Sequence, residues 1–449
     1  MAPRRSFRFA VLSAAVALSG VCGAAGSEPL RASLSAPAAA PQGARIRVEA
    51  LILNPNDAAA AFSYAARFAG LTVSGKPPSG RAWLAPRACL LIGWTGTVAA
   101  AKEASFALTL AGRAAGERRI RVAAAPKPAA LSRVAFLSKT PLILPMPEPG
   151  KTYTVEVTVT LGAYGERAAT ADRLAAVSGL DTNAIVGRGL VPAVLSGGRT
   201  PDIGLLAALQ TASGGWGLRP TGAPEVRTTS WVVFWLGQLG KADRERVARP
   251  LNRAAAYLRE SLAGAPVEMR ARVLPALAMS GRKTKRDAAL VRKDDAGKLS
   301  PMGRLLAAYG GADVPLPPKE AWGGLDGREM SVLVCHLADR KRMTEARSLL
   351  PALMKRRGAE PRFDTHEAPL YALALAKAAR PPEPGTAAVI TATVDGRKIK
   401  EVRITGGRPV ARLTLRVGGA APPGRRSRLS LAAAGARGPL CRVVVRPAD

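Results

Sequence analysis

Two hydrophobic periods divide the chain. From about residue 28 to 165, apolar side chains recur at every second position, as in "RIRVEALIL" from Arg45 and "TYTVEVTVTL" from Thr152. This period is typical of half-buried β-strands, and Gly, Pro, Asn or Asp bound each run. We therefore predict a β-sandwich over residues 28–128, and further strands over residues 129–165.

The period becomes helical between residues 166 and 380. The segment "LNRAAAYLRESL" places one apolar stripe on Leu251, Ala254, Ala255, Leu258 and Leu262. Alternation returns over residues 386–449, where "TATVDGRKIKEV" predicts a hairpin that turns at Asp395-Gly396. This order predicts a multidomain α+β fold: a β-sandwich, followed by a split β-domain with an inserted α/α toroid.

The N-terminus has the pattern of a secretory signal peptide. Basic residues precede the apolar run Phe9–Val21, and small residues follow it, so residues 1–25 are predicted to be removed by cleavage near Ala24 or Ala25. Val21 before Cys22 argues against a lipoprotein signal. The apolar run is too short to span a bilayer, and no later stretch is long enough. We expect an exported protein, periplasmic or extracellular, without a membrane span.

Export leaves three cysteines, namely Cys89, Cys335 and Cys441. An odd number allows at most one disulfide within the chain. Each cysteine lies in an apolar run, and we expect all three to be buried as small apolar side chains.

The charge is strongly basic, with 66 Lys and Arg against 32 Asp and Glu, a formal net charge of +34. Such a surface attracts polyanions, so anionic surface polymers are candidate partners. The densest basic runs, at residues 281–286, 354–358 and 424–428, fall at predicted turns. None of them interleaves aromatic residues as a nucleic-acid stacking platform does. We therefore expect no specific nucleic-acid partner.

An unusual turn follows the helical run that begins at Leu206, in "LAALQTASGGWGL". We expect the glutamine to cap carbonyl groups at the helix end, the glycines to adopt positive φ, and the indole to fill the gap between neighbouring helix pairs. The predicted structural turn comprises Gln210, Gly214, Gly215, Trp216 and Gly217.

The order of several segments along the chain resembles that of a known protein family. "LLAALQTASGGWG", "TTSWVVFWLGQLGK", "LNRAAAYLRE", "ARVLPALAMSG", "LSPMGRLLAAY" and "DTHEAPLYALALAKAA" follow one another as in the thioester-domain region of bacterial alpha-2-macroglobulins. The hairpin "TATVDGRKIKEV" resembles the β-segment that follows that domain. The resemblance implies a secreted, non-enzymatic protein with a role in protease inhibition or defence. Its implied partner is a protein, either a protease or another envelope protein.

The thioester motif of that family, Cys-x-Glu-Gln, is degenerate in this chain. The corresponding segment reads "SGLDTNAIVGRGL", which puts Asp181 at the cysteine position and Asn183 and Ala184 at the Glu and Gln positions. A thioester forms when a thiol condenses with a glutamine amide, and this segment has neither group. On this alignment, covalent trapping of an attacking protease is excluded.

The alternative is an enzyme built on the α/α toroid, such as a terpene cyclase, a prenyltransferase or a polysaccharide lyase. A cyclase needs an acidic Asp cluster, but the only paired aspartates, Asp294 and Asp295, have the pattern of a helix end or cap. A prenyltransferase needs zinc, and neither His336 nor His366 has ligand spacing to a cysteine. We expect no catalytic residue, metal or cofactor. A third possibility is an envelope scaffold held by its basic charge.

Overall fold

The structure is a computed structural model of the 449-residue chain. It describes residues 29–74, 77–122, 129–137, 140–149, 151–175, 177, 179–196, 203–281, 284, 287, 289–359, 367–383, 385–418, 426–435 and 439–448. The predicted signal peptide and His366 lie outside the described residues, as do residues 282, 283, 285 and 286 of one basic run and residues 424 and 425 of another. Within the described ranges, no helix is long and apolar enough to cross a bilayer.

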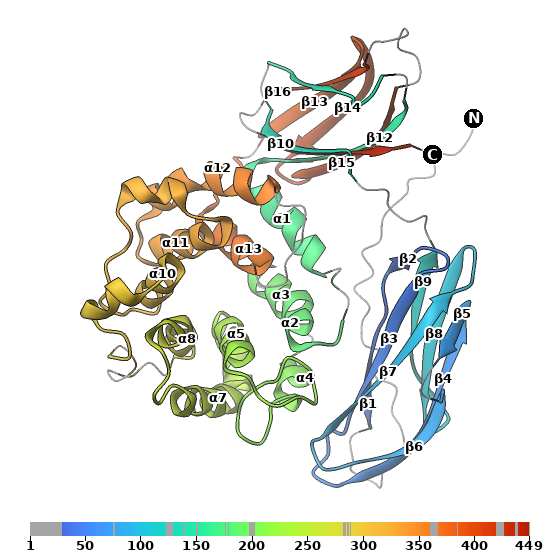
Figure 1. The fold of residues 1–449 in the computed structure, drawn as a ribbon, viewed down its shortest axis with the longest axis vertical. Coiled ribbons are helices and arrows are strands. Elements are labelled where there is room, and N and C mark those ends of the chain that lie inside the picture. Colours follow the sequence, from blue (N-terminus) through green and yellow to red (C-terminus); the bar gives the residue numbers. More distant parts are fainter. Residues whose placement is uncertain are drawn as a thin grey trace.

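The N-terminal part is a sandwich of two antiparallel-rich sheets (Figure 1). One sheet has the order β1-β3-β7-β5 and the other β2-β9-β8-β4-β6. Their inner faces enclose an aromatic centre, where the rings of Phe68, Trp94 and Phe106 lie 5.5–5.6 Å apart. The strands are β1 (Arg31–Ser35), β2 (Ala39–Ala40), β3 (Arg45–Leu53), β4 (Ala60–Ala69), β5 (Leu71–Ser74), β6 (Ser79–Leu84), β7 (Cys89–Val98), β8 (Glu103–Leu110) and β9 (Arg113–Val122).

A second β-domain is assembled from two segments far apart in the sequence. Its sheets have the orders β10-β17-β12-β15 and β11-β16-β13-β14, so each sheet contains strands from before and after the helices, and in the first sheet the two kinds alternate. The first segment supplies β10 (Leu131–Phe136), β11 (Leu142–Pro145) and β12 (Tyr153–Thr160). The second supplies β13 (Ala387–Val394), β14 (Arg397–Thr405), β15 (Val410–Val417), β16 (Arg428–Gly435) and β17 (Leu440–Pro447).

Strand β12 lies between β15 and β17, and its alternating pattern explains its position. Tyr153, Val155, Val157 and Val159 are buried, and they pack in the core of this β-domain with the inward residues of β17. A central strand has both edges paired, so its backbone groups need partners from both C-terminal strands. This pairing joins the two segments into one domain.

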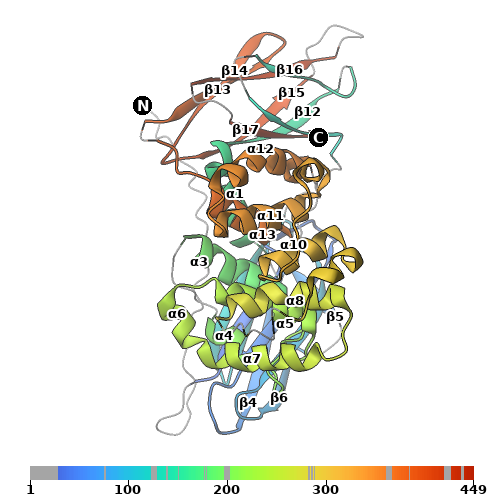
Figure 2. The same cartoon turned by 90° about the vertical axis from the view of Figure 1, so that its left-hand side faces the viewer.

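The helices lie between these two β segments in the sequence and follow one another around a ring (Figures 1 and 2). Contacts run from α2 through α5, α8, α10, α11 and α13 to α1, and α1 contacts α3, which follows α2 in the chain. The described elements are α1 (Gly162–Ala175), α2 (Thr182–Ile185), η1 (Val186–Leu190), α3 (Val191–Ser196), α4 (Ile203–Ala208), α5 (Val226–Gly237), α6 (Lys241–Arg246), α7 (Ala248–Ser261), α8 (Val267–Met279), η2 (Lys293–Lys298), α10 (Pro301–Tyr309), η3 (Lys319–Gly324), α11 (Gly327–Asp339), α12 (Met343–Ala359) and α13 (Glu367–Ala378).

The predicted fold class is confirmed: the chain is a multidomain α+β protein whose helices are inserted into a split β-domain. The stripe predicted along α7 is buried in the helical core. Helix α1 begins at Gly162, inside the range 129–165 that the alternation assigned to strands, because the chain enters the helix directly after β12.

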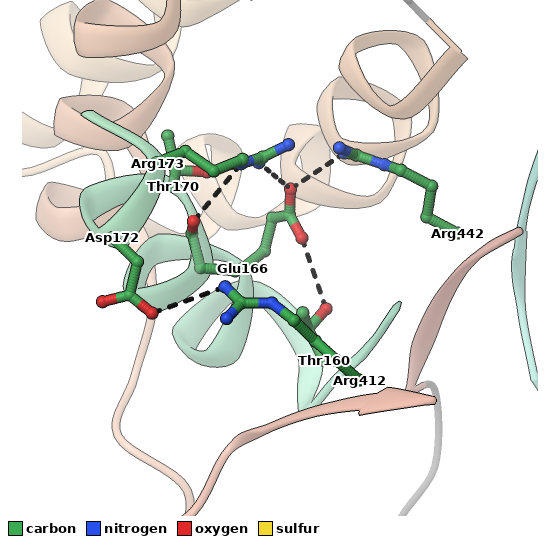
Figure 3. A network of polar contacts seen from close by, with 8 residues as sticks. Thr160, Glu166, Thr170, Asp172, Arg173, Arg412 and Arg442 are labelled. Carbon is green, nitrogen blue, oxygen red and sulfur yellow. Dashed lines mark hydrogen bonds and ion pairs between the residues drawn. The ribbon is translucent and has the colours of Figure 1, made fainter. Parts of the chain in front are cut away.

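A buried carboxylate joins the helical domain to the split β-domain (Figure 3). Glu166 in α1 has only 4% of its side chain exposed, and its Oε1 lies 3.2 Å from Nη2 of both Arg173 and Arg442. Thr160, the last residue of β12, donates a hydrogen bond to the other oxygen at 3.4 Å. A second pair, Arg412 with Asp172 at 3.5 Å, is half exposed. The Glu166 contacts fix α1 against β12 and β17.

We expect Glu166→Gln to destabilise this junction. The neutral amide leaves two arginines facing one another, and losing a buried charged hydrogen-bond acceptor costs about 1–3 kcal/mol. Asp172→Asn is the matched control, because an exposed ion pair contributes about 0–1 kcal/mol. Calorimetric melting should show a lower transition temperature for Glu166→Gln than for Asp172→Asn. Equal melting of both variants would show that the Glu166 contacts contribute nothing to stability.

Candidate functional site

The segment from Asp181, where the sequence analysis expects the degenerate thioester position, is a capped helix start. Asp181 precedes α2 in an extended conformation, and its Oδ1 accepts a hydrogen bond from the Ala184 backbone N–H at 2.9 Å. An aspartate at this position satisfies one of the free N–H groups of the first turn. Asn183 and Ala184 are buried in that turn. The Asp181 carboxylate is therefore used locally, as a cap.

Thr182 attaches this helix start to the glycine-rich turn. It is fully buried, and its hydroxyl donates to the Gly217 carbonyl at 2.6 Å. Its backbone N–H donates to the Leu218 carbonyl at 2.9 Å. The structure thus brings together the two sets of residues that the sequence singled out separately. Thr182 itself was not predicted, because it occupies the variable position of the motif.

Trp216 is the buried centre of the turn. It has no exposed surface, and its Nε1–H donates to the Leu206 carbonyl of α4 at 2.7 Å. Its backbone N–H donates to the Thr229 hydroxyl of α5 at 2.8 Å, and its carbonyl accepts from the Glu225 N–H at 3.0 Å. A buried indole needs a partner for its N–H, and α4 provides one. Trp216 consequently connects two consecutive helices.

The three glycines have different roles. Gly214 alone among them adopts a positive φ, +94°, so the expectation of positive φ for all three is wrong. At Gly217, an added Cβ would lie 2.6 Å from the Ala223 carbonyl oxygen. At Gly215, it would lie 2.9 Å from the ring of Tyr257. Close packing, more than backbone conformation, requires glycine at these two positions.

The predicted capping role of Gln210 is also wrong. Its Nε2 donates to the Gly214 carbonyl at 2.7 Å and to the Pro250 carbonyl at 2.8 Å. Neither carbonyl belongs to the end of α4. The amide reaches across the turn instead, and it connects the turn to the first residues of α7. The side chain therefore stabilises the contact between consecutive helix pairs.

The first β-sandwich contacts the same region. The Ser35 hydroxyl accepts a hydrogen bond from the Gly179 N–H at 2.9 Å, and the Cys89 thiol lies 3.6 Å from the Pro220 carbonyl. Leu51 packs into the helical core. The segment around Asp181 is thus held from one side by the turn and from the other by the sandwich. No sequence pattern indicated Ser35.

The thiols have the environment of structural cysteines. Cys89, Cys335 and Cys441 are all free; Cys335 and Cys441 are buried as expected, whereas Cys89 is only half-buried. Burial raises the pKa of Cys89 to about 11 and the pKa of both other thiols to about 12. Since the thiolate is the nucleophilic form, these groups are protonated and unreactive at neutral pH.

The groups required by the toroid-enzyme alternative are dispersed. Asp294 and Asp295 lie in η2, where Asp295 accepts from the Arg292 N–H at 3.0 Å, and this bond lowers the pKa of Asp295. His336 is buried beside Tyr309, and burial lowers its pKa. No cluster of three or more His, Cys, Asp or Glu suited to a metal occurs among the described residues. An acidic cyclase site or a zinc site is not assembled in the described part of the chain.

Among known proteins, solved structures of a bacterial alpha-2-macroglobulin are similar to this chain. No protein-family model matches the chain, and no curated protein matches its sequence. The structure is similar to native alpha-2-macroglobulin from Escherichia coli spanning domain MG7 to the C-terminus, with a TM-score of 0.49, 16% identity, and coverage of 94% of this chain and 75% of that chain. It is also similar to the cryo-EM native conformation of that protein, with a TM-score of 0.43, 15% identity, and coverage of 94% and 30% respectively. The chain thus spans less than a third of that second structure. Both similarities are at 15–16% identity, and they are similarities of fold.

We expect Trp216→Ala to destabilise the helical domain. Truncating a buried Trp costs about 3–5 kcal/mol, and here the Leu206 carbonyl also loses its partner. Trp83→Ala is the matched control, because Trp83 is 65% exposed. Thermal unfolding followed by circular dichroism at the helical signal should show a lower midpoint for Trp216→Ala only. An unchanged midpoint would mean that the turn does not support the helices.

Proposed function

We propose that the protein is an exported, non-enzymatic, alpha-2-macroglobulin-like protein that lacks a thioester and binds a protein partner without a covalent bond. A protease or another envelope protein is the expected partner. The observation that carries the proposal is the helix cap at Asp181, the residue that the sequence resemblance aligns with the reactive cysteine of thioester-bearing relatives.

The polar groups of this segment support the absence of a thioester. A thioester requires a thiol and a glutamine amide that face each other, and it must be protected from water until it reacts. Here the Asp181 carboxylate is bound by Ala184, and the Thr182 hydroxyl is bound by Gly217. The segment closes on itself through these hydrogen bonds, so a structural role is supported.

The basic charge supports a second candidate, an envelope scaffold attached to anionic surface polymers. Attraction that rests on a net charge of +34 weakens steeply with salt, because counterions screen it. Binding to a specific protein through a packed interface depends less on salt. The salt dependence of binding to envelope material therefore distinguishes the two candidates.

We expect methylamine to leave the intact mass of the mature protein unchanged, because there is no thioester to aminolyse. A thioester-bearing macroglobulin treated in parallel is the positive control. Any complex with a protease should dissociate in sodium dodecyl sulfate. A methylamine adduct on a peptide within residues 178–195, or a detergent-stable complex, would contradict the proposal.

A further inference from the structure

A cavity lies between α1 and the outer face of the sheet that contains β12, at the junction of the helical domain with the split β-domain (Figure 3). It holds about 180 Å³, the volume of about six water molecules. Its polar lining comprises Thr158, Glu166, Arg173, Arg412 and Arg442. The cavity is thus large enough for a small polar group, and most of its polar lining is arginine.

Strand pairing places two of these arginines beside one threonine. Thr158 of β12 lies opposite Arg412 of β15 on one side and opposite Arg442 of β17 on the other. Directly opposed residues of neighbouring strands share one face of the sheet, so both arginines flank Thr158 on the outer face. Arg173 approaches from α1 (Figure 3). Three guanidinium groups from three different elements therefore line one small cavity.

The carboxylates near these arginines leave two of the guanidinium groups only partly satisfied. One oxygen of Glu166 accepts from Nη2 of both Arg173 and Arg442 at 3.2 Å. Nε of Arg442 is buried and has no partner among the described residues. The only polar contact of Arg412 with a described residue is Asp172 at 3.5 Å, and that carboxylate is half exposed. With both carboxylates counted, three arginines still leave one positive charge uncompensated.

We propose that this cavity binds a phosphate monoester. A guanidinium can donate two parallel hydrogen bonds to a phosphate group, and such charge-assisted bonds are stronger than neutral ones. The phosphate accepts from Arg412, from Arg442 and from the Thr158 hydroxyl, which has no partner among the described residues. Glu166 holds Arg173 and Arg442 in place from the buried side. The ester remainder leaves the cavity on the side where Arg412 is exposed.

The same sheet face carries a second row of identical composition outside the cavity. Thr154 of β12 lies opposite Arg416 of β15 and Arg446 of β17. Of the described residues that line the cavity, none belongs to this second row. Attraction by net charge alone acts on both rows, whereas binding inside the cavity depends on Arg412. The second row therefore supplies the matched control.

Isothermal titration calorimetry of the full mature protein with glycerol 3-phosphate, at constant ionic strength and about pH 7.5, tests the proposal. A phosphate monoester carries close to two negative charges at this pH, since its second pKa is about 6. Dimethyl phosphate is the matched ligand, because it keeps the phosphorus oxyanion and carries a single charge. We expect one-to-one binding of glycerol 3-phosphate and at least tenfold weaker binding of dimethyl phosphate. No binding of glycerol 3-phosphate, or equal affinity for both ligands, would overturn the proposal.

Variants locate the site. Arg412→Gln should weaken the binding of glycerol 3-phosphate at least fivefold and Thr158→Val at least threefold, whereas Arg416→Gln should change it less than twofold. The Arg412 side chain is 59% exposed, and valine keeps the branched shape of Thr158, so both variants should fold. Each must retain the wild-type circular-dichroism spectrum. If Arg416→Gln weakens binding as much as Arg412→Gln, the attraction is general and the assignment to the cavity is overturned.

A phosphate monoester can come from a soluble or polymer-bound sugar phosphate or from a lipid headgroup, and vesicles distinguish these sources. Phosphatidylcholine vesicles that contain phosphatidic acid are sedimented with the protein. Vesicle binding that Arg412→Gln abolishes and Arg416→Gln preserves would assign the lipid headgroup. Binding of glycerol 3-phosphate without such vesicle binding would assign the soluble or polymer-bound ester. The proposal is independent of the thioester and of the protein partner.

Discussion

The pairing of β12 with both β15 and β17 is the constraint on which the rest of the architecture depends. Val157 lies opposite Leu413 on one side and Val443 on the other, so residues more than two hundred positions apart share one sheet. The chain leaves β12 and enters α1 within two residues, so this sheet also holds the start of the helical ring. Closing so long a loop costs conformational entropy, and burial of the alternating valines offsets it.

The same constraint sets the position of α1. The Leu161 N–H donates to the Pro409 carbonyl at 2.7 Å, directly before β15. Gly165 passes so close to that carbonyl that a Cβ would clash with it. Glu166 then accepts charged hydrogen bonds from Arg173 and from Arg442 of β17. Backbone and side-chain contacts thus fix the first helix of the ring to the sheet, and the following helices build on that start.

Local periodicity was sufficient to predict the strands, the apolar stripe of α7 and the insertion of helices into a β-domain. These features are repeated over many residues, so single exceptions do not hide them. The polar details were harder, because they depend on which distant backbone groups lie within reach. Gln210 contacts Pro250, and Thr182 contacts Gly217. No residue spacing in the sequence predicts either contact.

Cross-linking β12 to β15 tests the split β-domain most directly. Glu156 and Thr414 lie opposite each other, and directly opposed residues of antiparallel strands have Cα atoms about 4.5–5.5 Å apart, inside the range of about 4.4–6.8 Å that a disulfide spans. In the variant Glu156→Cys with Thr414→Cys, peptide mapping after mild oxidation should recover these two positions linked within one chain. In the control, Glu156→Cys with Arg416→Cys, the diagonal distance of about 7–8 Å should leave both thiols free. If the Glu156→Cys with Thr414→Cys variant stays reduced, or forms disulfides only between chains, the result would contradict the pairing of β12 with β15 and therefore the split β-domain.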